Sequence, residues 1–231
     1  MAPFGASRAG LMSVVGDDIP DSGLSQQAVM HWLFFEGEGT KFVDSVNNVE
    51  GSLNFDRWEL DSEFEEGTAP NYDGLSDEGV VAADDLVNIG DEGTVAVTHR
   101  PDTIDPNECF IGRVASDDDN QVGIRIDDSN SYRYGVGEDN NSASANINSG
   151  QKHALILTWE NGSANLYQDR DNISSDSYSG TVSIGAEDMG FGFDARGQHY
   201  HDGPVDDVVF DDSAWNSSER DNYWDRKAFL D

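Results

Sequence analysis

The chain has 231 residues and a formal net charge of −33, because 46 Asp and Glu residues oppose 13 Lys and Arg residues. Such a negative surface repels nucleic-acid phosphates and anionic lipid headgroups, which excludes nucleic-acid binding and disfavours membrane-surface binding. No run of residues is apolar enough to insert in a membrane. The chain is nevertheless 36% hydrophobic and 10% aromatic, so it can bury a core. Its length suits a single β-sandwich domain.

The kind of charge indicates a particular solvent. The only lysines are Lys41, Lys152 and Lys227, and Asp outnumbers Glu. Self-repulsion of so many carboxylates destabilises a fold at ordinary ionic strength, but at molar salt the Debye length falls to ~3 Å and the repulsion is screened. The composition therefore predicts a halophilic protein. The alternative is an acidic protein from an organism that lives at ordinary ionic strength.

Residues 1–30 differ from the rest of the chain. They are rich in Gly, Ala and Ser and lack the alternation of a strand, which predicts an N-terminal arm that becomes ordered on a partner. A tail or linker is the alternative interpretation. Residues 1–8 contain one Arg and no long apolar segment, so a secretion signal is not expected there. Residues 31–231 are predicted to form the folded domain.

From His31 onward the pattern is that of strands. Alternating segments are separated by Gly, Asn and Asp, and Glu160-Asn161-Gly162 is a hairpin signal. A short helix is expected near the C-terminus, with Ser217 or Ser218 as its cap. The predicted fold class is all-β, a two-sheet antiparallel jelly-roll sandwich. The predicted strands include 93–99, 121–126, 132–136 and 205–210, and the clearest are 153–159 and 163–168.

The only cysteine, Cys109, begins an apolar strand and cannot form an intrachain disulfide. It is predicted to be a small core residue.

Five segments in order resemble laminin G-like domains of the concanavalin A-like superfamily. The resemblance extends from about residue 31 to 225 and implies the jelly-roll fold. It does not by itself imply one function, because the superfamily contains lectins, adhesion modules and glycanases. The segments are Trp32–Gly37 with Val43–Asn48, Gly67–Gly74, Thr94–Pro101, Gln151–Trp159 with Leu166 and Tyr167, and Asp202–Phe210 with Ala214 and Trp215.

One motif is similar to a catalytic strand. Glu59, Asp61 and Glu63 form an E-x-D-x-E run, which on a strand places three carboxylates on one face. Glucanases of this superfamily use such a strand for a nucleophile and an acid/base. The run lies early in the domain, and acidic motifs arise readily in this composition. The sequence therefore predicts that the protein is not an enzyme.

The resemblance also implies a possible Ca²⁺ ion at one edge of the sandwich, since Ca²⁺ takes 6–8 oxygen ligands. By position its candidate ligands are Glu36, Asp44 and Asp206. The alternative is that these acids belong to a halophilic surface. No Cys/His spacing suits zinc.

Lectins of this superfamily bind sugars through aromatic side chains in loops or on the concave sheet. The corresponding candidates are Tyr72, His199, Tyr200 and His201. The alternative is that the tyrosine packs within a sheet and that the two histidines are exposed loop residues.

These expectations combine in one hypothesis. The chain is predicted to be a virion surface protein of a haloarchaeal virus, on a capsid or a tail fibre, in a high-salt extracellular setting. The arm would bind other virion proteins within a homo-oligomer, and the sandwich would face a host-surface glycan or glycoprotein. The alternative is a carbohydrate-binding or adhesion module on the surface of a halophile, and a β-glycanase is the third possibility.

Overall fold

A computed structural model describes residues 28–34, 36–60, 67–113, 121–128, 131–184, 188–193 and 199–226. These residues form two antiparallel sheets packed face to face, as predicted, with one α-helix near the C-terminus. The predicted N-terminal arm lies outside the described residues, apart from its last three. The first strand begins at Ala28, three residues before the predicted domain boundary. Among the described residues, no helix has the length and apolar character needed to cross a bilayer.

Sheet I carries the helix on its outer side. Its central strand, β16, pairs with β7 and β5 and also with β1. In spatial order its strands are β14 (Asp171–Ser177), β13 (Ser163–Gln168), β12 (His153–Glu160), β7 (Gly93–His99), β16 (Asp202–Asp211), β5 (Thr68–Asp73) and β4 (Trp58–Leu60), with β1 (Ala28–Trp32) added on β16.

Sheet II forms the other layer. Its middle strand, β15, is contributed from late in the chain and lies between β8 and β6. In spatial order its strands are β11 (Asp139–Ser144), β10 (Ser131–Gly137), β9 (Gln121–Asp128), β8 (Cys109–Arg113), β15 (Met189–Phe191), β6 (Gly79–Val81), β3 (Glu50–Leu53) and β2 (Lys41–Val43). A 3₁₀ turn, η1 (Ala83–Asp85), follows β6.

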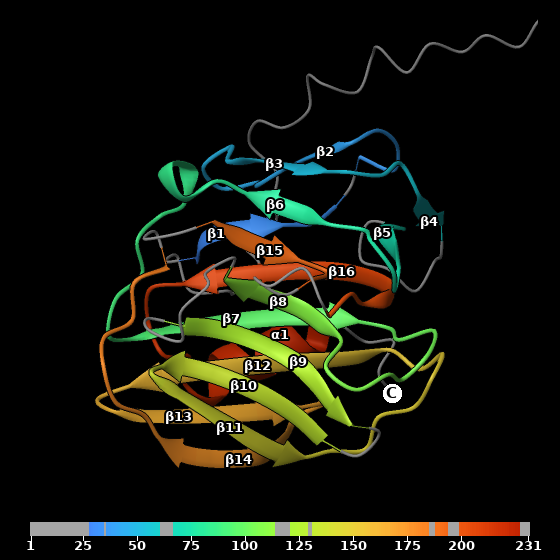
Figure 1. Cartoon of the computed structure of the whole chain (residues 1–231). Helices are drawn as coiled ribbons and strands as arrows, with labels where there is room; N and C mark the ends of the chain where they lie inside the picture. Colours follow the sequence, from blue (N-terminus) through green and yellow to red (C-terminus); the bar gives the residue numbers. More distant parts are fainter. Residues whose placement is uncertain are drawn as a thin grey trace, which may run out of the picture.

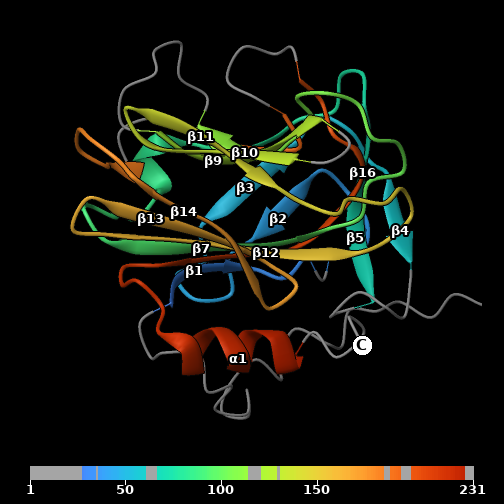
Figure 2. The same ribbon diagram turned by 90° about the horizontal axis from the view of Figure 1, so that it is seen from below.

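The molecule therefore has three layers: sheet II, sheet I and the helix α1 (Ser217–Arg226), which Figure 2 shows from the side. Because sheet I is covered on both faces, its central strands are apolar at odd and even positions alike. In β12, Leu155 and Leu157 belong to the main core between the sheets, whereas Ile156 packs under the helix with Tyr223 and Trp224. The helix thus closes a second, smaller core.

Two local signals in the sequence have clear structural outcomes. Asn161 and Gly162 both adopt positive φ angles, 49° and 78°, in the hairpin between β12 and β13, as predicted. The predicted serine caps of α1 are wrong, because Asn216 is the cap. Its Oδ1 accepts the backbone N–H of Ser218 (2.9 Å) and of Glu219 (3.2 Å), and the Glu219 carboxylate accepts the Asn216 N–H (2.7 Å). Cys109 is buried, as predicted.

Candidate functional site

Neighbouring strands of sheet I end in polar residues at one end of the sandwich. On the interior face of β12, the apolar row Trp159, Leu157, Leu155 ends at His153. On β13 the row of Ala164 and Leu166 ends at Gln168. Both polar side chains are buried, 1% and 6% exposed, at a position where the neighbouring rows are apolar.

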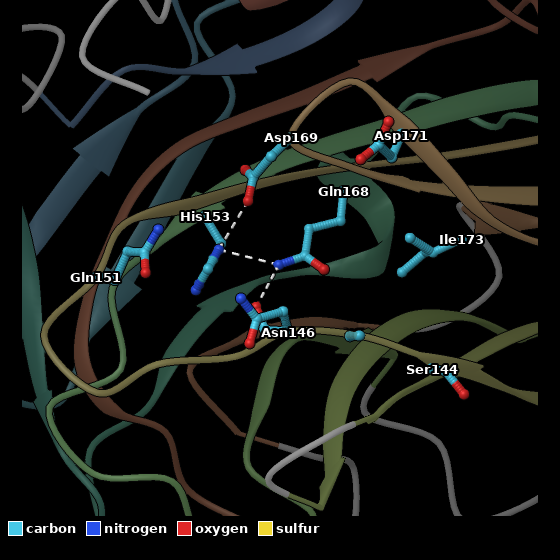
Figure 3. Close-up of a pocket in the computed structure, with 9 residues that line it drawn as sticks. Ser144, Asn146, Gln151, His153, Gln168, Asp169, Asp171 and Ile173 are labelled. Carbon is cyan, nitrogen blue, oxygen red and sulfur yellow. Dashed lines mark hydrogen bonds and ion pairs between the residues drawn. The ribbon is translucent and has the colours of Figure 1, made fainter. Parts of the chain in front are cut away.

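These polar ends line a cavity of about 400 Å³ between the edge strands of the two sheets. This volume is within the usual range of small-molecule sites. The cavity is lined by carboxylate, amide, imidazole and hydroxyl groups together with two apolar side chains, and it is called the β11–β14 pocket below. Its lining residues are Ser144, Ala145, Asn146, Gln151, His153, Gln168, Asp169, Asp171 and Ile173 (Figure 3).

His153 is the centre of a hydrogen-bond network in the pocket. Its Nδ1 lies 2.8 Å from Asp169 Oδ2, and the backbone N–H of Asn148 donates to its Nε2 at 3.4 Å. Nδ1 therefore carries the proton in the neutral ring, because Nε2 accepts. The Gln168 amide nitrogen lies 3.0 Å from Nδ1 and donates to the backbone oxygen of Asn146 at 2.8 Å.

The backbone explains why Asp169 lies here. Asp169 and Arg170 form the two-residue turn between β13 and β14, and both have positive φ angles, 48° and 82°. The turn holds the Asp169 carboxylate over the start of β12, where Oδ1 accepts the Ala154 N–H at 2.9 Å. The Asp169 N–H in turn donates to the Ala154 oxygen at 3.0 Å. The carboxylate is thus fixed on both sides, yet it remains 30% exposed.

The opposite wall is a loop, residues 145–152, between β11 and β12. The Gly150 N–H donates to the Pro101 oxygen at 2.7 Å, and the Ser149 hydroxyl donates to the Asp102 oxygen at 2.5 Å. Gly150 has a φ angle of 74°, which favours glycine. The loop is therefore held against a neighbouring loop by these two hydrogen bonds.

A row of buried histidines extends from the pocket into the core. His99 pairs with His153 across β7 and β12, and its ring lies 5.9 Å from that of His153 and 5.6 Å from that of His201. His99 Nε2 lies 3.1 Å from the hydroxyl of Tyr132, which comes from sheet II. His201 Nδ1 lies 3.0 Å from Glu108 Oε2. We call His201, His99 and His153 the histidine row.

Burial dominates the electrostatics of this row. It lowers the pKa of His99 well below 6.5, and the neighbouring His201 and His153 lower it further. Burial also raises the pKa of Tyr132 well above its usual value, and the Asp169 charge adds to this effect. His99 is therefore a neutral ring within the core, stacked on Phe110 with ring centroids 3.9 Å apart.

The structure separates the predicted glycan-binding residues. Tyr72 is 1% exposed, packs against Phe55 in the core, and has a pKa that burial raises; its ring cannot stack on a sugar. His201 is fully buried rather than exposed as expected, and its ring lies 5.6 Å from that of His99. His199 and Tyr200 are half-buried, and the Tyr200 hydroxyl donates to Glu78 at 3.3 Å. These last two remain predictions.

The predicted calcium ligands are not brought together. Asp44 is fully buried and its Oδ2 accepts the Asn47 N–H, whereas Asp206 lies 3.8 Å from the ammonium of Lys152. Glu36 accepts the Val43 N–H at 2.8 Å, and burial raises its pKa. Over the described ranges, no group of three His, Cys, Asp or Glu side chains could hold a metal ion. These three residues therefore do not fit a common Ca²⁺ ion.

Of the E-x-D-x-E run, only Glu59 lies among the described residues. Strand β4 ends at Leu60, and residues 61–66, which include Asp61 and Glu63, lie outside the described residues. Glu59 forms an ion pair with Arg100 and accepts a hydrogen bond from Asn71 at 3.2 Å. The described carboxylate of this run is thus part of a charge pair beside β5.

The residues that do line the pocket were not singled out from the sequence. A signal for two of them was present in the sequence. His153 and Gln168 lie at interior-facing positions of strands that were predicted correctly. A polar residue at an interior position indicates either a satisfied core group or a site. Asp169 and Asp171 gave no such signal, because aspartate is common throughout the chain.

Sequence and structure comparisons now assign this two-sheet jelly roll to a family. Residues 73–219, more than half of the chain, match the concanavalin A-like lectin/glucanases superfamily. The chain belongs to this family, as the sequence resemblance predicted. No curated protein sequence matches it.

Solved structures share the fold at low identity. Domain 4 of AbnA, a GH43 extracellular arabinanase from Geobacillus stearothermophilus in complex with arabinotriose, is 16% identical with a TM-score of 0.66, over 84% of this chain and 97% of that one. Trypanosoma rangeli sialidase with the inhibitor DANA is 14% identical with a TM-score of 0.66, over 92% and 35%. The chain thus spans about a third of the sialidase.

These neighbours correct one prediction. The sequence-based exclusion of enzymes is wrong, because solved structures that share this fold include carbohydrate-active enzymes and a domain of one. At 13–16% identity the likeness establishes the fold alone. The function of this chain must therefore be argued from its own pocket.

Proposed function

We propose that this chain is a carbohydrate-binding module that holds a saccharide in the β11–β14 pocket. Sugars present hydroxyl groups that both donate and accept hydrogen bonds, and they need converging partners of both kinds. The pocket provides them: carboxylates that accept, amides that do both, and Ile173 as an apolar contact. The observation that carries the proposal is this convergence of polar groups in one cavity.

The rigidity of the pocket supports the proposal. The Asp169 carboxylate accepts hydrogen bonds from His153 and Ala154, and each oxygen retains a second lone pair for a ligand hydroxyl. Gln168 is oriented by its bond to the Asn146 oxygen. Groups that are already oriented lose little conformational entropy on binding, which favours a weak ligand such as a sugar.

The test is a calorimetric binding titration in concentrated KCl. The ligands are neutral oligosaccharides, starting with arabinotriose. Gln151 and Asp171 are exposed lining residues, so Gln151→Ala and Asp171→Ala shorten the pocket wall without opening the core. We expect each to weaken binding about tenfold, the effect of one lost hydrogen bond to a charged or well-placed group. Release of reducing sugar is measured in the same samples, which detects any hydrolysis.

The matched control is Asp212→Ala. Asp212 is exposed and follows Asp211, which pairs with Thr94 at the opposite end of sheet I from His153. Its removal changes the net charge as Asp171→Ala does, but it leaves the pocket intact. Binding that is unchanged in both pocket variants would show that the saccharide lies elsewhere, and the half-exposed His199 and Tyr200 would then be the next residues to vary.

The setting of this module is a further part of the proposal. The net charge of −33 supports an extracellular, high-salt environment. The small-residue composition of residues 1–30 supports attachment to a partner, in its most specific form display as an oligomer on the virion of a haloarchaeal virus. Immunodetection in purified virions and in washed host cells separates this form from a cell-surface adhesion module.

A further inference from the structure

The β11–β14 pocket carries negative charge that no lining cation balances. Asp169 and Asp171 both line it, whereas its other lining residues are uncharged apart from the imidazole of His153. Both ring nitrogens of His153 already have partners, since Nδ1 lies 2.8 Å from Asp169 Oδ2 and the Asn148 N–H donates to Nε2. A ligand in the pocket therefore meets carboxylates and neutral dipoles.

The two cations adjacent in sequence to pocket residues are directed elsewhere. Lys152, between Gln151 and His153, is buried and its ammonium lies 3.8 Å from the Asp206 carboxylate. The guanidinium of Arg170, between Asp169 and Asp171, reaches the helix α1 and donates to Asp225 at 2.9 Å. Neither lines the cavity, so the cations that could attract an anionic ligand are held by other carboxylates.

From this arrangement we infer that the pocket selects uncharged saccharides and rejects those that carry a carboxylate, such as uronic or sialic acids. The inference rests on the proposed function and names the substrate class of the same site. A ligand carboxylate would lie beside Asp169 and Asp171 within a partly enclosed space, where like charges repel more strongly than in water. The hydroxyl groups of a neutral sugar instead donate to the same oxygens.

The experiment compares trisaccharides that differ only at one carbon. The gluco, galacto and manno series are each used in the neutral form and in the uronic form, in which the primary alcohol is oxidised to a carboxylate. Affinities are measured in 0.5 M and 3 M KCl, with circular dichroism showing that the protein is folded in both. In every series that binds, we expect the neutral form to bind at least tenfold more tightly in 0.5 M KCl. The ratio of the neutral affinity to the uronic affinity should be smaller in 3 M KCl, because salt screens the charge of the exposed Asp171.

Asp171→Lys tests the cause. It should improve the affinity for the uronic form at least tenfold. It should weaken binding of the neutral form about tenfold, as Asp171→Ala does, because a lysine cannot accept the hydrogen bond of a sugar hydroxyl. Asp212→Lys, at the far end of sheet I, changes the net charge equally and should alter neither affinity. If both variants improve uronate binding equally, the effect belongs to the whole surface and the inference fails.

The failures of the two proposals are distinguishable. If the unmodified protein binds a uronic form as tightly as its neutral partner, the inference on selectivity is wrong, whereas the proposed function stands. If arabinotriose and all neutral and uronic forms fail to bind to folded protein, the proposed function is wrong, and with it the selectivity that rests on it.

Discussion

Acid should destabilise the fold through His99. This ring is fully buried, and its pKa in the folded protein lies well below 6.5 because burial and the nearby His201 and His153 disfavour its charged form. The unfolded chain binds a proton at this residue near the ordinary pKa of about 6.5. Below that pH the unfolded state holds more protons than the native state, so the free energy of unfolding falls as pH falls.

The size of the effect follows from the same linkage. While His99 stays neutral in the fold, each pH unit below about 6.5 lowers the free energy of unfolding by about 1.4 kcal/mol. Between pH 7 and pH 5 the loss is about 2 kcal/mol from this one residue. The groups around it are His201 and His153 of the histidine row, Tyr132, and the carboxylates Glu108 and Asp169.

The variant His99→Gln isolates this contribution. Glutamine keeps a polar group toward Tyr132 but has no ring to stack on Phe110. Because it cannot ionise, it also removes the pH-dependent contribution of this residue to the free energy of unfolding. At pH 7 the variant should be less stable by on the order of 1–3 kcal/mol. Between pH 7 and pH 5 the free energy of unfolding should fall in both proteins. The fall should be about 2 kcal/mol smaller in the variant than in the unmodified chain.

The assay is urea denaturation at constant KCl, read by tryptophan fluorescence, since five tryptophans are present. All carboxylates titrate in both proteins, so their contribution cancels in the difference. His199→Gln is the control, because His199 is half-buried rather than enclosed, and it should keep the slope of the unmodified protein. Equal pH slopes for His99→Gln and the unmodified chain would refute the assignment.

Three further outcomes are expected. Asn216→Ala should lower the free energy of unfolding by about 1 kcal/mol, because Asn216 accepts hydrogen bonds from two backbone N–H groups of the helix α1. Ser217→Ala should change it by less than about 0.5 kcal/mol. If chemical denaturation shows the larger loss for Ser217→Ala, the serine is the cap. The melting temperature should fall by several degrees as KCl is lowered from 3 M to 0.1 M, because the charge of −33 loses its screening, and a melting temperature independent of salt would contradict the halophilic interpretation. Dialysis against EGTA should leave the melting temperature unchanged, since Glu36, Asp44 and Asp206 do not converge on one ion; a clear fall would assign a calcium ion to other ligands.

The fold was largely predictable because it rests on short-range patterns. Apolar alternation in Leu155, Leu157 and Trp159, and the positive φ angles at Asn161 and Gly162, are local consequences of residue type. The place of the strand β15 between β8 and β6 was not predictable, because its pairing joins residues far apart in the chain. The helix cap failed for a different reason: Asn216, Ser217 and Ser218 are all good caps, and only the backbone geometry selects one.

The binding residues were harder to predict because aromatic and acidic residues, which are typical of sugar and metal sites, are poor discriminators in this chain. Tyr72 illustrates the first difficulty, since an aromatic residue on a strand is most often part of the core, where Tyr72 indeed lies. Glu36, Asp44 and Asp206 illustrate the second. In a chain with 46 acidic residues, three carboxylates can match a pattern without meeting in space.

A polar residue at an interior strand position is a better signal in such a composition, because the neighbouring positions of the same interior row are apolar. His99, His153 and Gln168 all interrupt apolar rows, and all three are buried at the same end of sheet I. Burial of a polar group is unfavourable unless it is hydrogen-bonded, so each such residue must be held by a partner. The partners of His153 and Gln168 are the turn at Asp169 and the loop at Asn146, which are the two walls of the pocket. The same interruption of an apolar row that costs core packing therefore positions the site.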